Sequence, residues 1–182
     1  MAIWQFGLDF IPHHVVRGKY EPLPVTLPKQ MAEDYPWWAD IQPPFGFEEW
    51  IDDVLARANA LSQNMRMWGK EDGDSAFVCY DDNAKSRVTW IGFRVDVRQL
   101  SQAFVKSICM LGGRLECLLL TSTYHLLTPQ EQEILGAINI SVAMNYRKDP
   151  VSTLRSLKHT ATQIIPLPQR IEPKNQQKPS HG

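Results

Sequence analysis

Alternation of hydrophobic and polar residues predicts four strands in this chain. They cover residues 2–10, 75–80, 86–97 and 114–121. In the first strand, Phe6, Leu8 and Phe10 share one face, as a half-buried strand requires. The last strand is apolar almost throughout, which is typical of a central strand.

Apolar residues at helical spacing predict four helices. The first covers residues 47–62 and carries acidic side chains on its polar face, and the second covers residues 100–112. The sequence Thr128-Pro129-Gln130-Glu131 reads as a capping box with proline at the first helical position, so a third helix is expected to start there. Asp149-Pro150 is expected to begin a short final helix.

The order of these elements predicts an α+β fold. We expect a four-stranded antiparallel sheet with helices packed on one face, of the ferredoxin-like (split βαβ) type, with extra C-terminal helices. Residues 1–163 are expected to form a single domain with a long proline-rich loop over residues 11–45. Residues 164–182, rich in Pro, Gln and Lys, are expected to be a disordered tail.

The 182 residues carry a formal net charge of −1, but the charges are unevenly distributed. Residues 33–82 contain twelve acidic and three basic residues, whereas residues 83–182 contain thirteen basic and six acidic ones. Such a separation can attract a charged partner even when the whole molecule is almost neutral.

Several functional classes lack support in the sequence. No apolar run is long enough to cross a membrane and the first residues do not resemble a signal peptide, so we expect a cytoplasmic protein without a membrane partner. The acidic surroundings of the tryptophans argue against nucleic-acid binding. The segment Glu71-Asp72-Gly73-Asp74 lacks the rest of a calcium-loop pattern, so we expect no metal site and no cofactor.

The acidic segment is the candidate binding surface, because it also contains Trp37, Trp38 and other aromatic residues. Its side chains could form a solvated face, meet a basic partner, or bind a metal and act as acid or base; the tryptophans could equally pack in the core. The partner-binding hypothesis rests on the following residues: Trp37, Trp38, Asp40, Glu48, Glu49, Asp52, Asp53, Asp72 and Asp74.

Residues 87–154 contain V-T-W-I-G-F-R-V-D-V-R, then L-L-T-P, and end in S-V-A-M-N-Y-R-K-D-P-V-S-T-L. This stretch resembles small bacterial immunity proteins that are encoded beside contact-dependent or type VI secretion toxins. The resemblance implies a toxin inhibitor that acts by protein–protein interaction without catalysis.

We therefore expect a non-catalytic, immunity-type protein that binds a cognate protein toxin with a basic surface. Two alternatives remain open. One is a carboxylate- or metal-dependent hydrolase that uses the same acidic residues, and the other is a ferredoxin-like regulatory domain that binds a small ligand.

Overall fold

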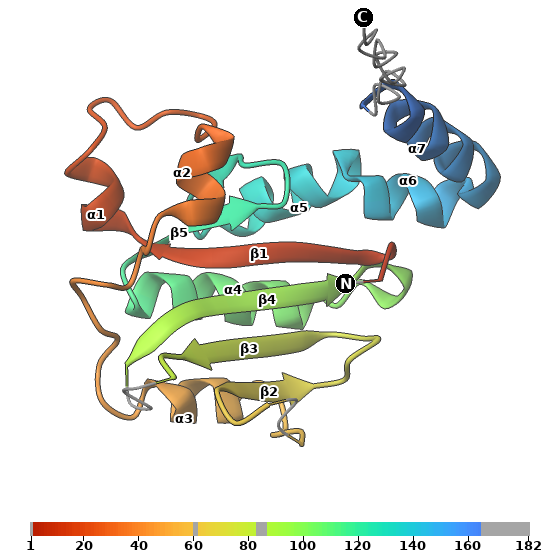
Figure 1. The fold of residues 1–182 in the computed structure, drawn as a ribbon. Helices are drawn as coiled ribbons and strands as arrows, with labels where there is room; N and C mark the ends of the chain where they lie inside the picture. The colour runs from red at the N-terminus through yellow and green to blue at the C-terminus, as the bar shows by residue number, and fades with distance from the viewer. Residues whose placement is uncertain (1, 60–61, 83–86, 165–182) are drawn as a thin grey trace, which may run out of the picture.

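A computed structural model describes residues 2–59, 62–82 and 87–164 of the chain. Its centre is a six-stranded antiparallel sheet with the strand order β2-β3-β4-β1-β5-β6 (Figure 1). The α+β class with an antiparallel sheet is thus confirmed, but the sheet has six strands where the sequence predicts four.

The strands are β1 (Gln5–Pro12), β2 (Met65–Gly69), β3 (Ser75–Tyr80), β4 (Val88–Asp96), β5 (Cys117–Thr121) and β6 (Leu126–Leu127). The α-helices are α1 (His13–Arg17), α2 (Lys29–Asp34), α3 (Phe47–Asp52), α4 (Gln102–Arg114), α5 (Glu131–Ile140), α6 (Val142–Lys148) and α7 (Pro150–Ile164). A short 3-10 helix, η1, covers Val97–Gln99.

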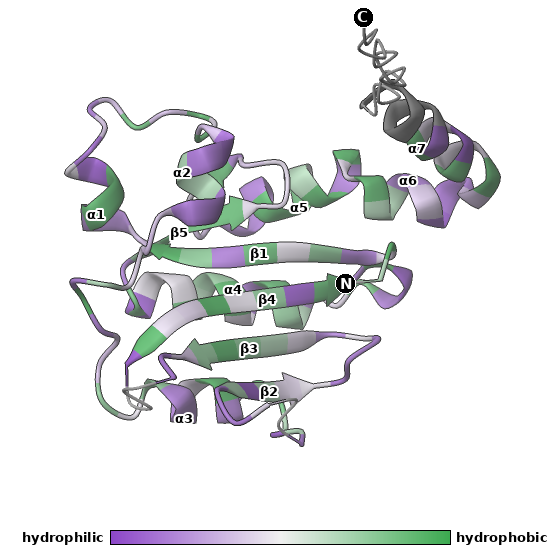
Figure 2. Ribbon diagram, viewed as in Figure 1, coloured by the Kyte–Doolittle hydropathy of each residue, from purple (hydrophilic) through white to green (hydrophobic). Residues whose placement is uncertain are grey.

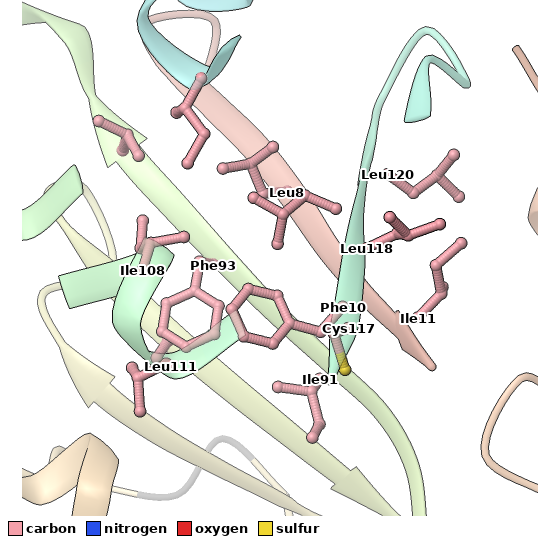
Figure 3. Close-up of a cluster of buried hydrophobic side chains, with 14 of the residues drawn as sticks. Leu8, Phe10, Ile11, Ile91, Phe93, Ile108, Leu111, Cys117, Leu118 and Leu120 are labelled. Carbon is pink, nitrogen blue, oxygen red and sulfur yellow. The ribbon is translucent and has the colours of Figure 1, made fainter. Parts of the chain in front are cut away.

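Part of the core lies on the back face of the sheet, which is the face that α4 covers. Leu8 lies opposite Phe93 in the β1–β4 pair, and both side chains are almost fully buried. The Phe93 ring lies 4.6 Å from Phe10 and 6.4 Å from Phe104 of α4, measured between ring centroids. Figure 3 shows Ile108 of α4 beside this aromatic group. Burial of these side chains against α4 follows from the alternation that predicted the two strands.

The front face of the sheet is also covered, although the sequence predicts helices on one face only. Leu118 and Leu120 of β5 point away from α4, toward the side of Ile11 (Figure 3). The indole of Trp38 donates a hydrogen bond to the carbonyl oxygen of Phe10, at 3.0 Å. The segment 13–46, which includes α1 and α2, therefore lies against the strands from the side opposite α4 (Figure 1).

Two short edge strands account for the error in strand number. The sequence Met65-Arg66-Met67-Trp68-Gly69 pairs with β3, although it alternates too weakly to predict a strand. At the other edge, β6 has two residues, too few for any periodic signal. Both strands form because a neighbouring strand offers unpaired backbone groups, which is a tertiary effect.

The helix predicted over residues 47–62 ends at Asp52, ten residues early. After a turn, the backbone of residues 56–58 pairs with β2: Ala58 donates its N–H to Met67, and Gly69 donates its N–H to Ala56. The apolar periodicity beyond Asp52 therefore reflects packing beside a strand rather than a helical face.

The structure also bears on two predicted helix starts and on the predicted C-terminal tail. Helix α5 begins at Glu131 after Gln130, so the capping box predicted at Thr128 is wrong by two residues, although Glu133 does accept a hydrogen bond from the Thr128 N–H. The predicted cap of α7 is confirmed, because the Asp149 carboxylate accepts from the Ser152 N–H. The predicted tail, apart from Ile164, lies outside the described residues.

No helix within the described ranges has the length and apolar character needed to span a membrane.

Candidate functional site

A cavity of about 600 Å³ opens on the front face of the sheet, and we call it the front cavity. Strands β1, β4 and β5 form its floor, and the segment that contains α2 forms its wall. Its volume lies within the usual range for ligand pockets, about 300–1,000 Å³. The lining residues used below are Asp9, Glu33, Asp34, Tyr35, Trp37, Trp38, Trp90 and Tyr124.

Asp9 places a carboxylate on the floor of the front cavity. It lies in the middle of the central strand β1 and is the cross-strand partner of Gly92 on β4. A Cβ atom at position 92 would lie 2.2 Å from the Trp90 ring, so the indole of Trp90 lies over Gly92. The missing side chain of Gly92 therefore brings an aromatic ring next to the Asp9 carboxylate.

Burial raises the pKa of Asp9 to about 6, against the opposing effects of a hydrogen bond from Trp90 and the positive charge of Arg94. Arg94 does not form a salt bridge with Asp9, and its guanidinium instead lies 4.2 Å from the centroid of the Phe77 ring. Within the described part of the chain, the Asp9 carboxylate has no ion-pair partner.

Three aromatic residues close together in sequence, Tyr35, Trp37 and Trp38, fix the wall of the front cavity. Trp38 is 3% exposed and is anchored to β1 through its indole N–H. The ring of Tyr35 lies 4.7 Å from that of Trp37 in an edge-on arrangement. The buried indole N–H of Trp37 has no hydrogen-bond partner in the described structure. Such an unsatisfied donor is unusual in a folded protein.

The rim of the front cavity carries further acidic and aromatic groups. Tyr124, in the turn between β5 and β6, donates its hydroxyl hydrogen bond to Glu33 of α2. Its backbone has a φ of 65°, a left-handed conformation that is costly for a bulky residue. The ammonium of Lys19 lies 4.2 Å above the ring of Tyr35. The rim therefore already holds one cation against an aromatic face.

Two of the acidic residues predicted on the first helix, Glu48 and Asp52 of α3, form a separate, internally paired group on the back face. Asp52 accepts hydrogen bonds from Arg57 and from the indole of Trp68, both at 2.7 Å. Glu48 accepts from Arg57, Arg66 and the hydroxyl of Tyr80. The hydrogen bond from Arg57, opposed by partial burial, lowers the pKa of Asp52.

The remaining predicted acids divide into exposed and structural ones. Asp40, Glu49 and Asp53 are exposed. Asp74 instead accepts a hydrogen bond from the Asp96 N–H at 2.8 Å, and burial raises its pKa. The carbonyl of Asp72 accepts from the indole of Trp4 and from Arg98.

The structure thus places the predicted acidic surface in three regions of the fold. Trp37 and Trp38 lie on the front face, Glu48 and Asp52 lie on the back face, and the loop with Asp74 lies at the end of the sheet where β1 begins. These residues are close together in the sequence, but they do not form one continuous surface in the fold. Two arginines of the same segment, at positions 57 and 66, neutralise the largely buried carboxylate of Glu48.

Neither Asp9 nor Trp90 is among the site residues predicted from the sequence. Both residues alternate with core residues along their strands, so the pattern places them on a solvent-facing side. One signal was available: an aspartate at the centre of a strand is unfavourable, and strands in the middle of a sheet seldom contain it.

Among residues 2–59, 62–82 and 87–164, no three His, Cys, Asp or Glu side chains gather closely enough to hold a metal ion. Comparisons with family models, with curated proteins and with solved structures returned no match.

Proposed function

We propose that this chain is a non-catalytic binding protein that accepts a positively charged side chain of a protein partner in the front cavity. The observation that carries the proposal is the Asp9 carboxylate, which lies beneath aromatic walls without an ion-pair partner in the described structure. A lysine or arginine entering from outside would supply the missing charge and would pack against the aromatic rings.

The acidic rim favours a cation over other ligands. Asp34 and Glu33 line the cavity together with Asp9. Two lysines lie near this rim: Lys29 is 3.9 Å from Glu33 in an exposed position, and Lys19 lies over the ring of Tyr35. A phosphate or carboxylate would meet three acidic groups there. An apolar ligand would leave the Asp9 carboxylate buried without compensation, which is costly.

Binding is favoured over hydrolysis because the acidic residues of the hydrolase hypothesis do not form one reactive group. Two of them, Glu48 and Asp52, are engaged by arginines and by aromatic donors. The pKa of Asp52 is lowered by its hydrogen bond from Arg57, which makes this carboxylate a poor general base. The resemblance of residues 87–154 to bacterial immunity proteins supports the biological role that we propose. In this role the chain is an immunity-type inhibitor of a bacterial toxin, with a basic side chain of the toxin in the front cavity.

The fold we propose is a ferredoxin-like core with an added strand at each edge. The central order β3-β4-β1-β5 is the order of a split βαβ arrangement. Helices α3 and α4 support this assignment, because Trp68 and Phe93, which contact them, lie on the same face of the sheet.

The first test uses a short glycine-flanked lysine peptide as the cation, followed by NMR of the tryptophan indole N–H signals. We expect the peptide to shift the signals of Trp37 and Trp90, and Asp9→Asn to weaken binding at least tenfold. Asp53→Asn is the matched control, because Asp53 is exposed on the back side of the sheet and has no ion-pair partner in the described structure. Equal loss in both variants, or no shift of either indole signal, would reject the front cavity as a cation site.

The second test addresses the toxin. The protein encoded beside this gene is titrated against the wild-type chain and against Asp9→Asn by calorimetry. We expect tight binding to the wild type and a loss of at least tenfold in the variant, because a buried charge would lose its partner. A neighbouring protein that does not bind contradicts the immunity role, and undiminished binding to Asp9→Asn contradicts the site.

A further inference from the structure

A second cavity, of about 570 Å³, lies where β1 begins and β5 ends, under helices α5 and α6; we call it the apolar cavity. One face of α5, made by Glu133, Gly136, Ala137 and Ile140, forms one wall. These residues follow the i, i+3, i+4, i+7 spacing of a single helical stripe. The opposite stripe, with Ile134 and Ile138, is fully buried in the core.

Gly136 is the most informative residue of this wall. It lies in the middle of α5, where glycine is less favourable than alanine. A Cβ at this position would meet no atom within 4 Å, so internal packing does not require glycine. The glycine instead leaves space on the side of the helix that lines the apolar cavity.

Apolar side chains around the apolar cavity remain exposed. Ile140 is 81% exposed and Val142 is 44% exposed, and both line it together with the buried Phe6. Figure 2 shows hydrophobic stretches at the end of α5 and the start of α6, where these residues lie. Exposed aliphatic groups beside an open space are typical of a surface that binds an apolar ligand.

Seven polar residues also line the apolar cavity, and two of them, His125 and Glu133, bear most on the chemistry of the ligand; the others are Gln5, Thr121, Ser122, Thr123 and Ser141. The Nδ1 atom of His125 is 3.1 Å from the hydroxyl of Thr123, and its Nε2 atom makes no hydrogen bond in the described structure. Glu133 also lines the cavity and brings a negative charge that opposes an anionic ligand. An imidazole nitrogen without a hydrogen bond in the described structure, beside exposed aliphatic side chains, suits a largely apolar ligand with an uncharged polar group.

From the open space beside Gly136 and the exposed aliphatic side chains around it, we infer that the apolar cavity binds a small, uncharged, largely apolar molecule whose one polar group meets His125. The apolar cavity adjoins the front cavity at Thr121 and Ser122, which line both. The rest of the lining differs: Trp90 and Tyr124 line only the front cavity, and Gly136 and Ile140 line only the apolar one.

The test uses N-phenyl-1-naphthylamine, an uncharged fluorescent probe, with 1-decanol as competitor. We expect saturable binding of the probe, displacement by the alcohol, and at least a tenfold loss of affinity in Gly136→Leu, which projects a bulky side chain into the cavity. Gly113→Leu is the matched control, because Gly113 also lies in a helix, a Cβ there would also meet no atom within 4 Å, and the residue does not line this cavity. Asp9→Asn should bind the probe normally.

A second variant keeps the test decisive if Gly136→Leu fails to fold. Ile140→Asn changes a side chain that is 81% exposed, so the fold should tolerate it, and it should weaken probe binding at least threefold. Equal affinity of the wild type, Gly136→Leu and Ile140→Asn would overturn the inference. So would a concentration-dependent dimer that Gly136→Leu disrupts, because a second copy would then be the occupant.

Discussion

Burial of the Asp9 carboxylate is unfavourable for the strand that contains it. Its neighbours Leu8 and Phe10 are fully buried on the back face, and its own side chain faces the partly closed front cavity. A charged carboxylate loses hydration there without gaining a salt bridge in the described structure. Such a cost is common at binding sites, where a ligand later offsets it.

The raised pKa of Asp9 predicts how stability changes with pH. The folded state binds the Asp9 proton with a pKa of about 6, whereas the unfolded state has an ordinary value near 4. The folded state therefore holds more protons in this interval, and this group's contribution to the free energy of unfolding falls as pH rises from about 4 to about 6. The groups around Asp9 are Arg94, Glu33 and Asp34.

The prediction is measured as a difference between the wild type and Asp9→Asn in urea unfolding at pH 4 and pH 7. The variant should gain stability relative to the wild type between these two values, by up to about 2 kcal/mol, after allowance for partial exposure. A constant difference across the interval would show that Asp9 has an ordinary pKa in the folded protein.

Substitutions of the adjacent residues Glu48 and Glu49 give a second prediction about the free energy of unfolding. Glu48→Gln should lower the free energy of unfolding by about 1–3 kcal/mol, because Arg57 and Arg66 would lose their shared carboxylate while Glu48 is only 13% exposed. Glu49→Gln, at an exposed position, should change it by less than about 0.5 kcal/mol. Chemical denaturation of both variants checks the prediction, and equal effects would contradict the buried network.

At the scale of elements, the pair of strands β1 and β4 builds the floor of the front cavity. Gly92→Ala would place a methyl group against the Trp90 ring and force the indole to move. We expect a loss of about 1–3 kcal/mol in the free energy of unfolding and a change in tryptophan fluorescence.

A double-mutant cycle separates this contact from other effects of the alanine. In a Trp90→Leu background, Gly92→Ala should cost clearly less than in the wild type, since the ring that it displaces is gone. Additive losses would mean that Trp90 does not lie over Gly92.

In helix α5, one substitution is expected to stabilise the protein. Gly136→Ala should raise the free energy of unfolding by about 0.5–1 kcal/mol, because alanine is the better helix former and its Cβ meets no neighbouring atom. Thermal unfolding followed by circular dichroism measures the change. A destabilised variant would show that the helix needs the glycine for packing.

At the scale of the whole molecule, the sheet separates charges that the sequence groups together. Glu48 and Asp52 of α3 lie on the back face and are paired with arginines, whereas Asp9, Glu33 and Asp34 lie around the front cavity. The long-range field of this arrangement is weaker than that of one continuous acidic face, and the net charge is only −1.

We therefore predict a shallow salt dependence for the association of a cationic partner. Between about 50 and 200 mM salt, the association rate constant should fall by less than about tenfold, because few unpaired charges act together at long range. Stopped-flow fluorescence of the tryptophans measures this rate. A steeper fall would indicate that the exposed acids, Asp40, Glu49 and Asp53, also face the partner.

The sequence predicted the parts of the fold that depend on periodic burial. The alternation in β1, β3 and β4 predicted their positions to within three residues at either end, because half-buried strands require a period of two. The short edge strands β2 and β6 and the early end of α3 were missed, because they depend on backbone pairing with a neighbouring strand.

The sequence by itself determined the class of the fold, the central strands and the presence of an acidic, aromatic segment, since hydrophobic periodicity and composition are local properties. Only the tertiary structure decided which acids remain without a partner in the described residues: it brought Arg57 to Glu48, and it placed Asp9 beneath Trp90 through the pairing with Gly92. The reason is physical, because the charge state and burial of a side chain depend on neighbours that are distant along the chain.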